Sequence, residues 1–323
     1  MDSDAANAAR GNDSSGSYEA WYVTVNDGGG RGFWIRYTTF QPVAGLPLAS
    51  HAALWAFAFD RDNPSANWGA KQLFPLGALQ TESRPFAIRL AGAVLSGDGC
   101  SGALHSERGD ARWDLRWTSR EPPFPFLLPR WQGLSSVANI GARPALSVSG
   151  TIEIGGRIHQ LDGAPGGQQH TWGSSHALAW NWGFASGADF WVDGASSRVR
   201  SRFGRVLTGT AVGVQAADQR FLFNGPLQVL RTRGQISAEG WNARAQIGDR
   251  VLNLSVVPRR EDLVGVTYAD PRGGKRFCYH TEVADLELRL TRKDQTLAHV
   301  TKRACAAFEY ASEVPLPGFP PLF

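Results

Sequence analysis

Apolar and polar side chains alternate at every second position in most segments of this chain that are not turns. In the segment ARWDLRWTS, Trp113, Leu115 and Trp117 fall on one face of an extended strand, and three charged residues fall on the other. The same alternation recurs in LSVSGTIEI, WNARAQI, VLNLSVV and VADLELRL. Helical spacing sustained beyond about ten residues is hard to find. The pattern therefore predicts an all-β protein built as an antiparallel sandwich or barrel.

A proline-rich stretch divides the alternating segments into two groups. At 323 residues the chain is longer than most single hydrophobic cores allow, which favours two domains. Residues 121–130, EPPFPFLLPR, cannot continue a central strand, because proline lacks the backbone N–H that a sheet requires. We expect a disordered tail at residues 1–17, a first β-barrel at 18–130, a linker at 131–140, a second β-barrel at 141–312 and a proline-rich tail at 313–323.

The two groups of strands open in a similar way. AWYVTVNDGGGRGFWIR begins at Ala20, and AWNWGFASGADFWVDG begins at Ala179. Each starts with Ala-Trp, passes through a glycine-containing turn and returns through Phe-Trp and a β-branched residue. This short match supports two related β-domains.

Charge and hydropathy exclude several classes of partner. The chain has 33 Lys and Arg against 29 Asp and Glu, and its arginines are spread over both halves, so we expect no nucleic-acid partner. No window reaches the ~18 uninterrupted apolar residues of a membrane helix, and residues 1–17 lack the apolar core of a signal peptide. These features predict a cytoplasmic protein without a membrane span, which leaves room for peripheral membrane contact. The oligomeric state stays open.

Motifs for metals, cofactors and activated nucleophiles are absent from the sequence. Cys100, Cys278 and Cys305 are odd in number and form no CxxC pair, which argues against a disulfide framework or a zinc knot. The chain also lacks a GxSxG elbow, a GxxxxGK[ST] phosphate loop and an HExxH helix. We therefore expect no metal and no cofactor, and either cofactor-free chemistry or simple ligand binding.

The stretch GGQQHTWGSSHALAWNWG holds the most concentrated candidate site. If the chain is extended from His176, then His176, Trp180 and Trp182 share one face, with an ionisable ring beside two indoles. His170 and Trp172 then fall in a loop just before that strand. A histidine in an aromatic wall can act as an acid or base, and indole faces can stabilise a developing cation. For each histidine, a hydrogen-bonded structural role is the equal alternative.

Two further pairs place an acid beside a ring. His280 and Glu282 are in phase with the apolar face of FCYHTEVADLEL, so they must be paired, with each other or with an arginine, or must face a cavity. Near the start, SYEAWY puts Glu19 and Trp21 on one face, where a buried indole would raise the pKa of the acid and suit it to proton donation. A salt-bridged Glu19 at a strand start is the simpler account.

Arg198, Arg200 and Arg202 recur at every second residue. This spacing is typical of a solvated strand face. The less expected alternative is that the three guanidinium groups line a path for a carboxylated ligand.

Three short motifs carry a resemblance to a known family. YEAWY near the start, VSGTIEIGGRIHQLDG before QHTWG, and the following WNW are similar to the two-domain lipocalin-like superfamily of carotenoid 1,2-hydratase (hydroxyneurosporene synthase), tocopherol cyclase and lipocalin-type Diels-Alderases. In the hydratase pattern, aromatic-Glu-x-Trp-Tyr lies near the start and Asp-His-x-Trp-Gly opens the second domain. The residues that fit these two elements are Glu19, Trp21, Tyr22, His170, Trp172 and Gly173.

The resemblance implies two calycin-like β-barrel domains, no cofactor in the hydratase and cyclase members, and a hydrophobic isoprenoid or polyene substrate. The reactions that it implies are water addition, ring closure and cycloaddition. One residue departs from the pattern: Gln169 stands where the hydratases have an aspartate, and an amide cannot protonate an alkene. Glu19, His170 or Asp193 would have to replace that acid, or a pericyclic step would need none.

Two functions remain after these considerations. The leading hypothesis is a cofactor-independent enzyme acting on a hydrophobic terpenoid or polyene, and the alternative is a non-catalytic lipocalin-like carrier. The expected catalytic residues are His170, Glu19 and His176. The residues expected to bind the substrate are Trp21, Gln169, Trp172, Trp180, Trp182, His280 and Glu282.

Overall fold

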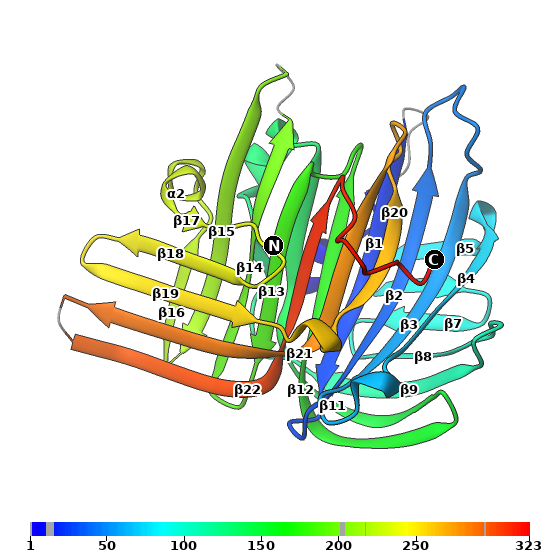
Figure 1. The fold of residues 1–323 in the computed structure, drawn as a ribbon, viewed down its shortest axis with the longest axis horizontal. Helices are drawn as coiled ribbons and strands as arrows, with labels where there is room; N and C mark the ends of the chain where they lie inside the picture. Colours follow the sequence, from blue (N-terminus) through cyan, green and yellow to red (C-terminus); the bar gives the residue numbers. More distant parts are fainter. Residues whose placement is uncertain (1, 11–15, 201–203, 217, 294) are drawn as a thin grey trace.

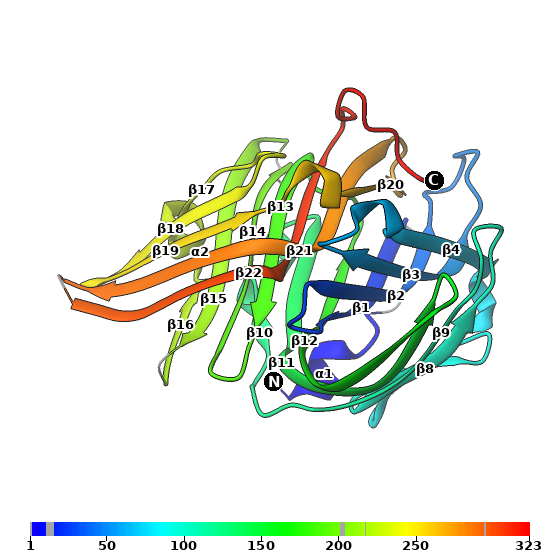
Figure 2. The same ribbon diagram turned by 60° about the horizontal axis from the view of Figure 1, so that its bottom comes forward.

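The computed structural model contains two antiparallel sheets and little helix (Figure 1). Strands account for 64% of the chain and helices for 8%. The first sheet forms a nearly closed barrel and the second curls beside it, so the predicted all-β fold of two barrel-like domains is confirmed (Figures 1 and 2). The structure describes residues 2–10, 16–200, 204–216, 218–293 and 295–323.

The first sheet contains twelve strands. In spatial order they are β4 (Trp68–Pro75), β3 (His51–Asp60), β2 (Arg31–Gln41), β1 (Ser17–Asn26), β12 (Arg157–Gly173), β11 (Val137–Ile154), β9 (Ala111–Thr118), β8 (Gly99–Leu104), β7 (Ala93–Ser96), β6 (Phe86–Leu90) and β5 (Leu79–Ser83), and the short β10 (Phe124–Pro125) pairs with β11.

The second sheet contains ten strands. In spatial order they are β16 (Gln219–Phe223), β15 (Val206–Ala216), β14 (Phe190–Arg200), β13 (Ala179–Ser186), β22 (Gln295–Ser312), β21 (Lys275–Arg292), β19 (Arg250–Val257), β18 (Trp241–Ile247) and β17 (Arg233–Gly234), and β20 (Val264–Ala269) pairs with β21.

Both sheets follow one plan. A four-stranded meander, β1 to β4 or β13 to β16, is followed by strands that return and pair with the first strand of the meander: β12 pairs with β1, and β22 pairs with β13. Each return ends in a long hairpin, β11–β12 or β21–β22 (Figure 2). The similar sequences that begin at Ala20 and Ala179 therefore form equivalent hairpins, β1–β2 and β13–β14.

The chain passes from the first sheet to the second between Gly173 and Ala179, and not at residues 131–140, where the sequence predicted a linker. The prolines do interrupt the strands, and the 3-10 helix η3 (Pro129–Leu134) follows them. Strand β11, however, then pairs with β9, which precedes the prolines. The proline-rich stretch is consequently a crossover within the first sheet, because sheet membership depends on long-range pairing that a local break does not reveal.

The helical segments are few and short. They are α1 (Ser3–Asn7), α2 (Pro226–Arg231), η3 and the 3-10 turns η1 (Pro64–Ala66), η2 (Leu76–Ala78) and η4 (Arg260–Asp262). No helix in the described part of the chain has the length and apolar character needed to cross a membrane.

The N-terminal segment is folded, which corrects the expectation of a disordered tail. Ala6 and Asn7 of α1 are fully buried, because α1 packs between β11, β12 and the strands β5 and β6 at one end of the first barrel (Figure 2). The Trp21 indole donates to Asn7 O at 2.8 Å, and the Asn7 amide donates to Gln168 Oε1 at 2.8 Å. Residues 11–15 of the expected tail lie outside the described ranges.

The C-terminal tail, residues 313–323, packs on the second sheet. Thr267 N donates to Phe323 O at 2.8 Å, and Leu322 N donates to Gly265 O at 2.7 Å. The tail thereby covers backbone groups of β20 that would otherwise form a free strand edge.

Strand alternation distributes the apolar side chains among three main cores. In β9, Trp113, Leu115 and Trp117 are buried and the intervening charged residues are exposed, as the sequence predicted. Strands β1, β2 and β3 differ, because one face fills the first barrel and the other packs against the second sheet. Trp34 and Trp182 meet in this third core. Large aromatic side chains therefore line the space between the two sheets.

Candidate active site between the two sheets

A cavity of about 280 Å³ lies between the two sheets. Its inner wall is made of rings from four strands: Tyr22, Trp34, Trp180, Trp182 and Tyr268. The helices η3 and α2 and the strands β11, β14 and β15 contribute further lining residues. Since a 150 Å³ apolar cavity is large enough for benzene, this volume has room for a ligand of about two fused rings.

The alternation of β2 and β13 explains why these rings face the cavity. In β2, Phe33 and Ile35 fill the first barrel, so Trp34 and Arg36 point the other way, toward the second sheet. In β13, Trp180 and Trp182 face the first sheet. Gly183 faces the second barrel, where a Cβ would lie 2.6 Å from the Trp241 ring, so that position must lack a side chain. Glycine in this strand thus allows close packing behind the cavity wall.

Arg36 supplies a positive charge in the cavity wall. Its guanidinium Cζ lies 4.5 Å from the centre of the Trp34 ring and 4.9 Å from that of Tyr268, and Nη1 donates to the Tyr268 hydroxyl at 2.7 Å. Tyr22 and Trp55 lie at 5.7 and 5.3 Å from the same Cζ. Within the described ranges no carboxylate forms an ion pair with Arg36. Aromatic faces and one phenol therefore hold the cation.

Glu309 of β22 supplies a negative charge in the same wall. The Trp180 indole donates to Oε1 at 2.6 Å, and the Tyr268 hydroxyl donates to Oε2 at 3.5 Å. His280 Nδ1 lies 3.5 Å from Oε2. Burial raises the pKa of Glu309, but His280, the charge of Arg36 and the hydrogen bond from Trp180 together outweigh burial and hold it below the ordinary value. Glu309 is therefore ionised at neutral pH.

His280 and Glu282 form a buried pair behind this wall. His280 Nε2 lies 2.9 Å from Glu282 Oε1, and the imidazole stacks on Trp34 with the ring centroids 4.0 Å apart. Burial lowers the pKa of His280, yet the bonds and charges of Glu282 and Glu309 more than offset it, so the pKa is raised. Burial raises the pKa of Glu282 to about 7. The pair does not line the cavity, but it contacts Trp34 and Glu309, which do.

His176 lines the cavity from the segment before β13. Its ring lies 4.0 Å from the Tyr18 ring, centroid to centroid, and Nε2 lies 3.1 Å from Ala269 O. This bond makes Nε2 the protonated nitrogen and leaves the lone pair on Nδ1. The His176 backbone N–H donates to Asp270 Oδ2 at 2.8 Å, which fixes the segment. Burial lowers the pKa of His176 to about 4, so the ring is neutral at physiological pH and Nδ1 keeps its lone pair.

His170, by contrast, lies inside the first barrel. Its Nδ1 donates to Ala6 O at 2.9 Å, and Nε2 lies 2.8 Å from Glu19 Oε1. Trp21 stacks on the ring at 5.0 Å, and Trp172 packs at 4.7 Å. The expectation that Glu19, His170, Trp21 and Trp172 face the substrate is therefore corrected, because these side chains point away from the cavity and pack around α1. Alternation is the cause: in β12, Thr171 faces the cavity and His170 faces the opposite side.

Gln169 lies beside the buried acid Asp193 at the junction of the sheets. The Trp182 indole donates to Asp193 Oδ1 at 2.9 Å. Burial raises the pKa of Asp193 to about 7, and the nearby Gln169 amide lowers it by less. Within the described part of the chain, neither polar atom of the Gln169 amide nor Asp193 Oδ2 meets the geometry of a hydrogen bond. Asp193 is thus a partly protonated acid directly behind a cavity-lining indole.

Of the predicted site residues, the structure brings His176, Trp180 and Trp182 together in the cavity. Sequence reasoning missed Arg36 and Glu309. Each interrupts an apolar strand, FWIRYTTF or ACAAFEYA, and an isolated charge in such a strand must have partners or face a cavity. This signal was available from the sequence. The described residues contain no cluster of three His, Cys, Asp or Glu side chains that could hold a metal ion.

Comparison with known proteins agrees with this architecture. No family model matches the chain. The chain is 28% identical over 281 residues to the uncharacterized protein Rv0493c of Mycobacterium tuberculosis. This alignment covers 85% of this chain and 82% of that protein. A crystal structure of CghA with Sch210972 has a TM-score of 0.60 at 9% identity and covers 97% of this chain and 96% of that chain. Kievitone hydratase from Nectria haematococca has a TM-score of 0.51 at 9% identity, with 93% and 89% covered. The structural similarities show a shared fold of two antiparallel barrel-like sheets.

Proposed function

We propose that this protein is an enzyme that adds water to, or closes a ring in, a small hydrophobic molecule of terpenoid type held in the cavity between the sheets. One observation carries the proposal: a neutral histidine, His176, lines the same aromatic cavity as the guanidinium of Arg36. The first group can accept a proton, and the second can stabilise negative charge that develops on a substrate oxygen.

The cavity limits the substrate. A volume of about 280 Å³ fits a compact molecule better than a fully enclosed long polyene. The walls are mostly rings, while the polar groups Arg36, Tyr268 and Glu309 occupy one region. We therefore expect an apolar substrate that carries one conjugated carbonyl and one hydroxyl, or a carbonyl substrate that takes up water.

The residues support a balanced addition reaction. His176 Nδ1 takes the proton from a substrate hydroxyl or a water molecule. The oxygen of that hydroxyl or water bonds to the β-carbon of the conjugated carbonyl. The electron pair of that double bond moves to the carbonyl oxygen, where Arg36 and the hydroxyls of Tyr18 and Tyr22 stabilise it. Burial raises the pKa of both phenols, so they remain hydrogen-bond donors. The imidazolium of His176 then returns the proton to the α-carbon, which completes the addition.

The proteins of shared fold support this class of reaction. Kievitone hydratase is a hydratase by name, and CghA was crystallised with the small molecule Sch210972. Both have the two-barrel arrangement over nearly their whole length. An aromatic cavity between two sheets, as in this chain, is suited to conversions that depend on substrate positioning.

The test begins with the ligand that the protein carries. Wild-type protein and the cavity-filling variant Ala195→Phe would be extracted, and the bound small molecules identified by mass spectrometry. We expect an apolar compound in the wild-type protein and much less in Ala195→Phe. The compound and its unsaturated or ring-open precursor would then be incubated with wild-type protein, His176→Gln and the exposed control His105→Gln.

We expect product from wild-type protein and His105→Gln, and a loss of about 10²-fold or more in His176→Gln, the usual contribution of a general base. Equal product formation by His176→Gln would contradict the proposed role of this residue. Absence of any bound apolar compound would contradict the proposed substrate class.

A carrier function is the second candidate, and the bonding of the polar groups favours it. Arg36 Nη1 donates to Tyr268 and Glu309 accepts from Trp180, so these bonds are accounted for without chemistry, while Arg36 Nε has no hydrogen-bond partner among the described residues. A carrier would release the bound compound unchanged, and His176→Gln would alter only the dissociation constant. Conversion of the compound by the wild-type protein distinguishes the enzyme from the carrier.

A further inference from the structure

Exposed apolar side chains gather beside the cavity. Leu227 and Leu230 of α2 are 65% and 59% exposed, and Val206 and Leu207 at the start of β15 are 47% and 44% exposed. Leu207 and Leu230 also line the cavity. We call these four residues the α2 rim. Large apolar side chains clustered in water at the edge of a binding cavity are typical of an interaction surface.

The chain around the α2 rim is strongly basic. Residues 194–238 contain a single acidic residue, Asp218. The same segment contains the arginines Arg198, Arg200, Arg202, Arg205, Arg220, Arg231 and Arg233. Arg202 lies outside the described ranges, and Arg198 and Arg200 are exposed on β14, as expected for a solvated face. In the described part of the chain no carboxylate pairs with Arg231 or Arg233.

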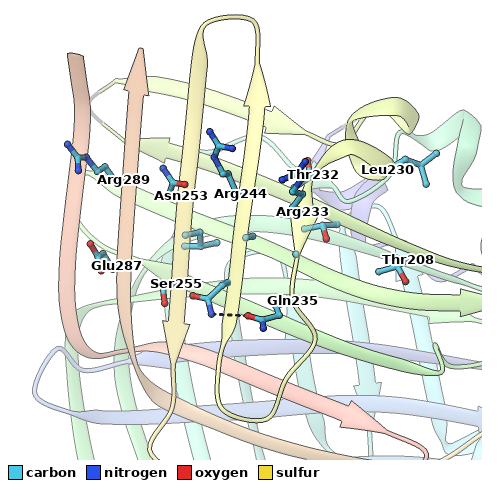
Figure 3. A pocket seen from close by; sticks show the side chains of 15 residues that line it. Thr208, Leu230, Thr232, Arg233, Gln235, Arg244, Asn253, Ser255, Glu287 and Arg289 are labelled. Carbon is cyan, nitrogen blue, oxygen red and sulfur yellow. Dashed lines mark hydrogen bonds between the residues drawn. The ribbon is translucent and has the colours of Figure 1, made fainter. Parts of the chain in front are cut away.

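A polar basin of about 850 Å³ continues from α2 across the outer face of the second sheet (Figure 3). Arg233, Arg244, Asn253 and Arg289 are successive cross-strand neighbours in this basin, and Figure 3 shows them in one row that leads to Leu230. Like charges on directly opposite residues destabilise a sheet, and adjacent strands are only ~4.8 Å apart. No described carboxylate pairs with these three arginines. The directly opposite pair is Arg233 and Arg244; Arg289 lies beyond Asn253, and Glu287 also lines the basin. An anion placed beside Arg233 and Arg244 would relieve their repulsion, so this part of the basin is suited to phosphate groups.

We propose that the α2 rim and this arginine row dock the protein on an anionic membrane surface. The apolar side chains of the rim enter the acyl region, and the arginines contact lipid phosphates. Apolar residues flanked by arginine are the arrangement that interfacial binding requires. Because the cavity adjoins the rim, an apolar substrate then passes from the bilayer to the cavity without crossing water. The passage of substrate from the bilayer to the cavity rests on the proposed function, but the membrane docking does not.

The docking is tested by sedimentation with vesicles. The full-length protein would be mixed with vesicles of phosphatidylcholine alone, or of phosphatidylcholine with about one third phosphatidylglycerol, at low and high salt. We expect sedimentation with the anionic vesicles, little with the neutral ones, and a marked loss at high salt. Equal binding to both vesicles, or binding to neither, would overturn the proposal.

Two variants separate the contributions of the rim and the row. Val206→Gln with Leu227→Gln alters exposed rim residues that do not line the cavity, and should lower partitioning about tenfold or more. Its matched control is Leu73→Gln with Ile158→Gln, which alters equally exposed apolar residues of the first sheet. Circular dichroism would confirm that both variants fold.

Arg244→Gln with Arg289→Gln should lower partitioning on anionic vesicles about 25-fold, since each arginine near such a surface contributes about fivefold. Arg112→Gln with Arg116→Gln, on the exposed face of β9, is the matched control and should bind as wild type does. Loss in the arginine variant with full binding in the rim variant would indicate a site for soluble polyanions and overturn membrane docking. Vesicle binding by a protein that carries no apolar ligand would support docking and count against the proposed function alone.

Discussion

Two histidines that lie six residues apart have different surroundings in the structure, and these surroundings determine which ring nitrogens are free. His170 and His176 share the motif QHTWGSSH, yet both ring nitrogens of His170 contact protein groups inside the first barrel, while His176 lines the cavity. The difference arises because His170 lies in β12 on the face that packs around α1, whereas His176 follows the end of β12 at Gly173, in the segment that crosses to the second sheet. The reaction that we propose for the cavity is therefore assigned to His176, whose Nδ1 retains its lone pair.

The pKa of His176 provides a direct test of its surroundings. Burial lowers this pKa to about 4, so the ring should stay neutral from pH 8 to about pH 5 and take up a proton only near pH 4. NMR titration of the histidine ring signals would measure it, with His176→Gln used to assign the resonance. A midpoint near the ordinary 6.5 would show that the ring is solvated and would contradict the site as described.

The raised pKa of Asp193 should make the stability of the folded protein depend on pH. Its pKa is 3.8 ordinarily and about 7 in the folded protein, so between these values the unfolded chain loses a proton that the folded chain keeps. The free energy of unfolding should therefore fall as pH rises from about 4 to 7. Asp193→Asn removes this loss, retains an acceptor for the Trp182 indole, and should gain roughly 2–4 kcal/mol at pH 8 but less at pH 5. Urea unfolding at both pH values measures the gain, and the exposed Asp189→Asn should show none.

At the scale of elements, α1 packs at one end of the first barrel and is not a free tail. The sequence suggested disorder because residues 1–17 are polar and rich in small side chains. Two of their partners, Gln168 and His170, lie in β12, far along the chain, and no local sequence pattern predicts such contacts. The strands themselves were predictable, since alternation is local. Their pairing across the prolines was not, because register between β9 and β11 is a long-range property.

Deletion of α1 should lower the free energy of unfolding, because buried polar groups of the first barrel would lose their hydrogen-bond partners. A chain that begins at residue 11 leaves the Trp21 indole N–H without Asn7 O and the His170 Nδ1–H without Ala6 O, each at about 1–3 kcal/mol. Gln168 Oε1 still accepts from Arg143. We expect a fall in Tm of roughly 5–15 °C in calorimetry, with ligand binding in the cavity retained at low temperature. Asn7→Ala should give part of the loss and the exposed Asn63→Ala none. An unchanged Tm would show that α1 does not stabilise the barrel.

At the scale of the whole molecule, the two barrels are joined by more than the aromatic core. Arg61, which follows β3 of the first sheet, donates from Nη1 to Asp262 Oδ2 and from Nη2 to Asp285 Oδ2, both at 2.9 Å and both in the second domain. Nη1 also donates to Val283 O at 3.0 Å, and the Asn26 amide donates to Glu282 O at 3.0 Å. These bonds end close to Glu282, whose partner His280 contacts the cavity wall. The geometry of the site therefore depends on how the sheets are docked.

This coupling predicts how the protein unfolds. Because the third core contains residues of both sheets, the wild-type protein should unfold in a single calorimetric transition rather than two. Arg61→Met preserves most of the side-chain volume but removes the ion pair with Asp285, which keeps the Ala304 N–H, and leaves Asp262 with Arg259 alone, so we expect a cost of roughly 1–3 kcal/mol for the lost hydrogen bonds. We expect a lower Tm, still a single transition, and weaker ligand binding, because the cavity lies at the loosened junction. The exposed control Arg157→Met should leave Tm and binding unchanged. Two separate transitions in the wild-type protein would show that the barrels fold independently, and the site would then have to lie within one of them.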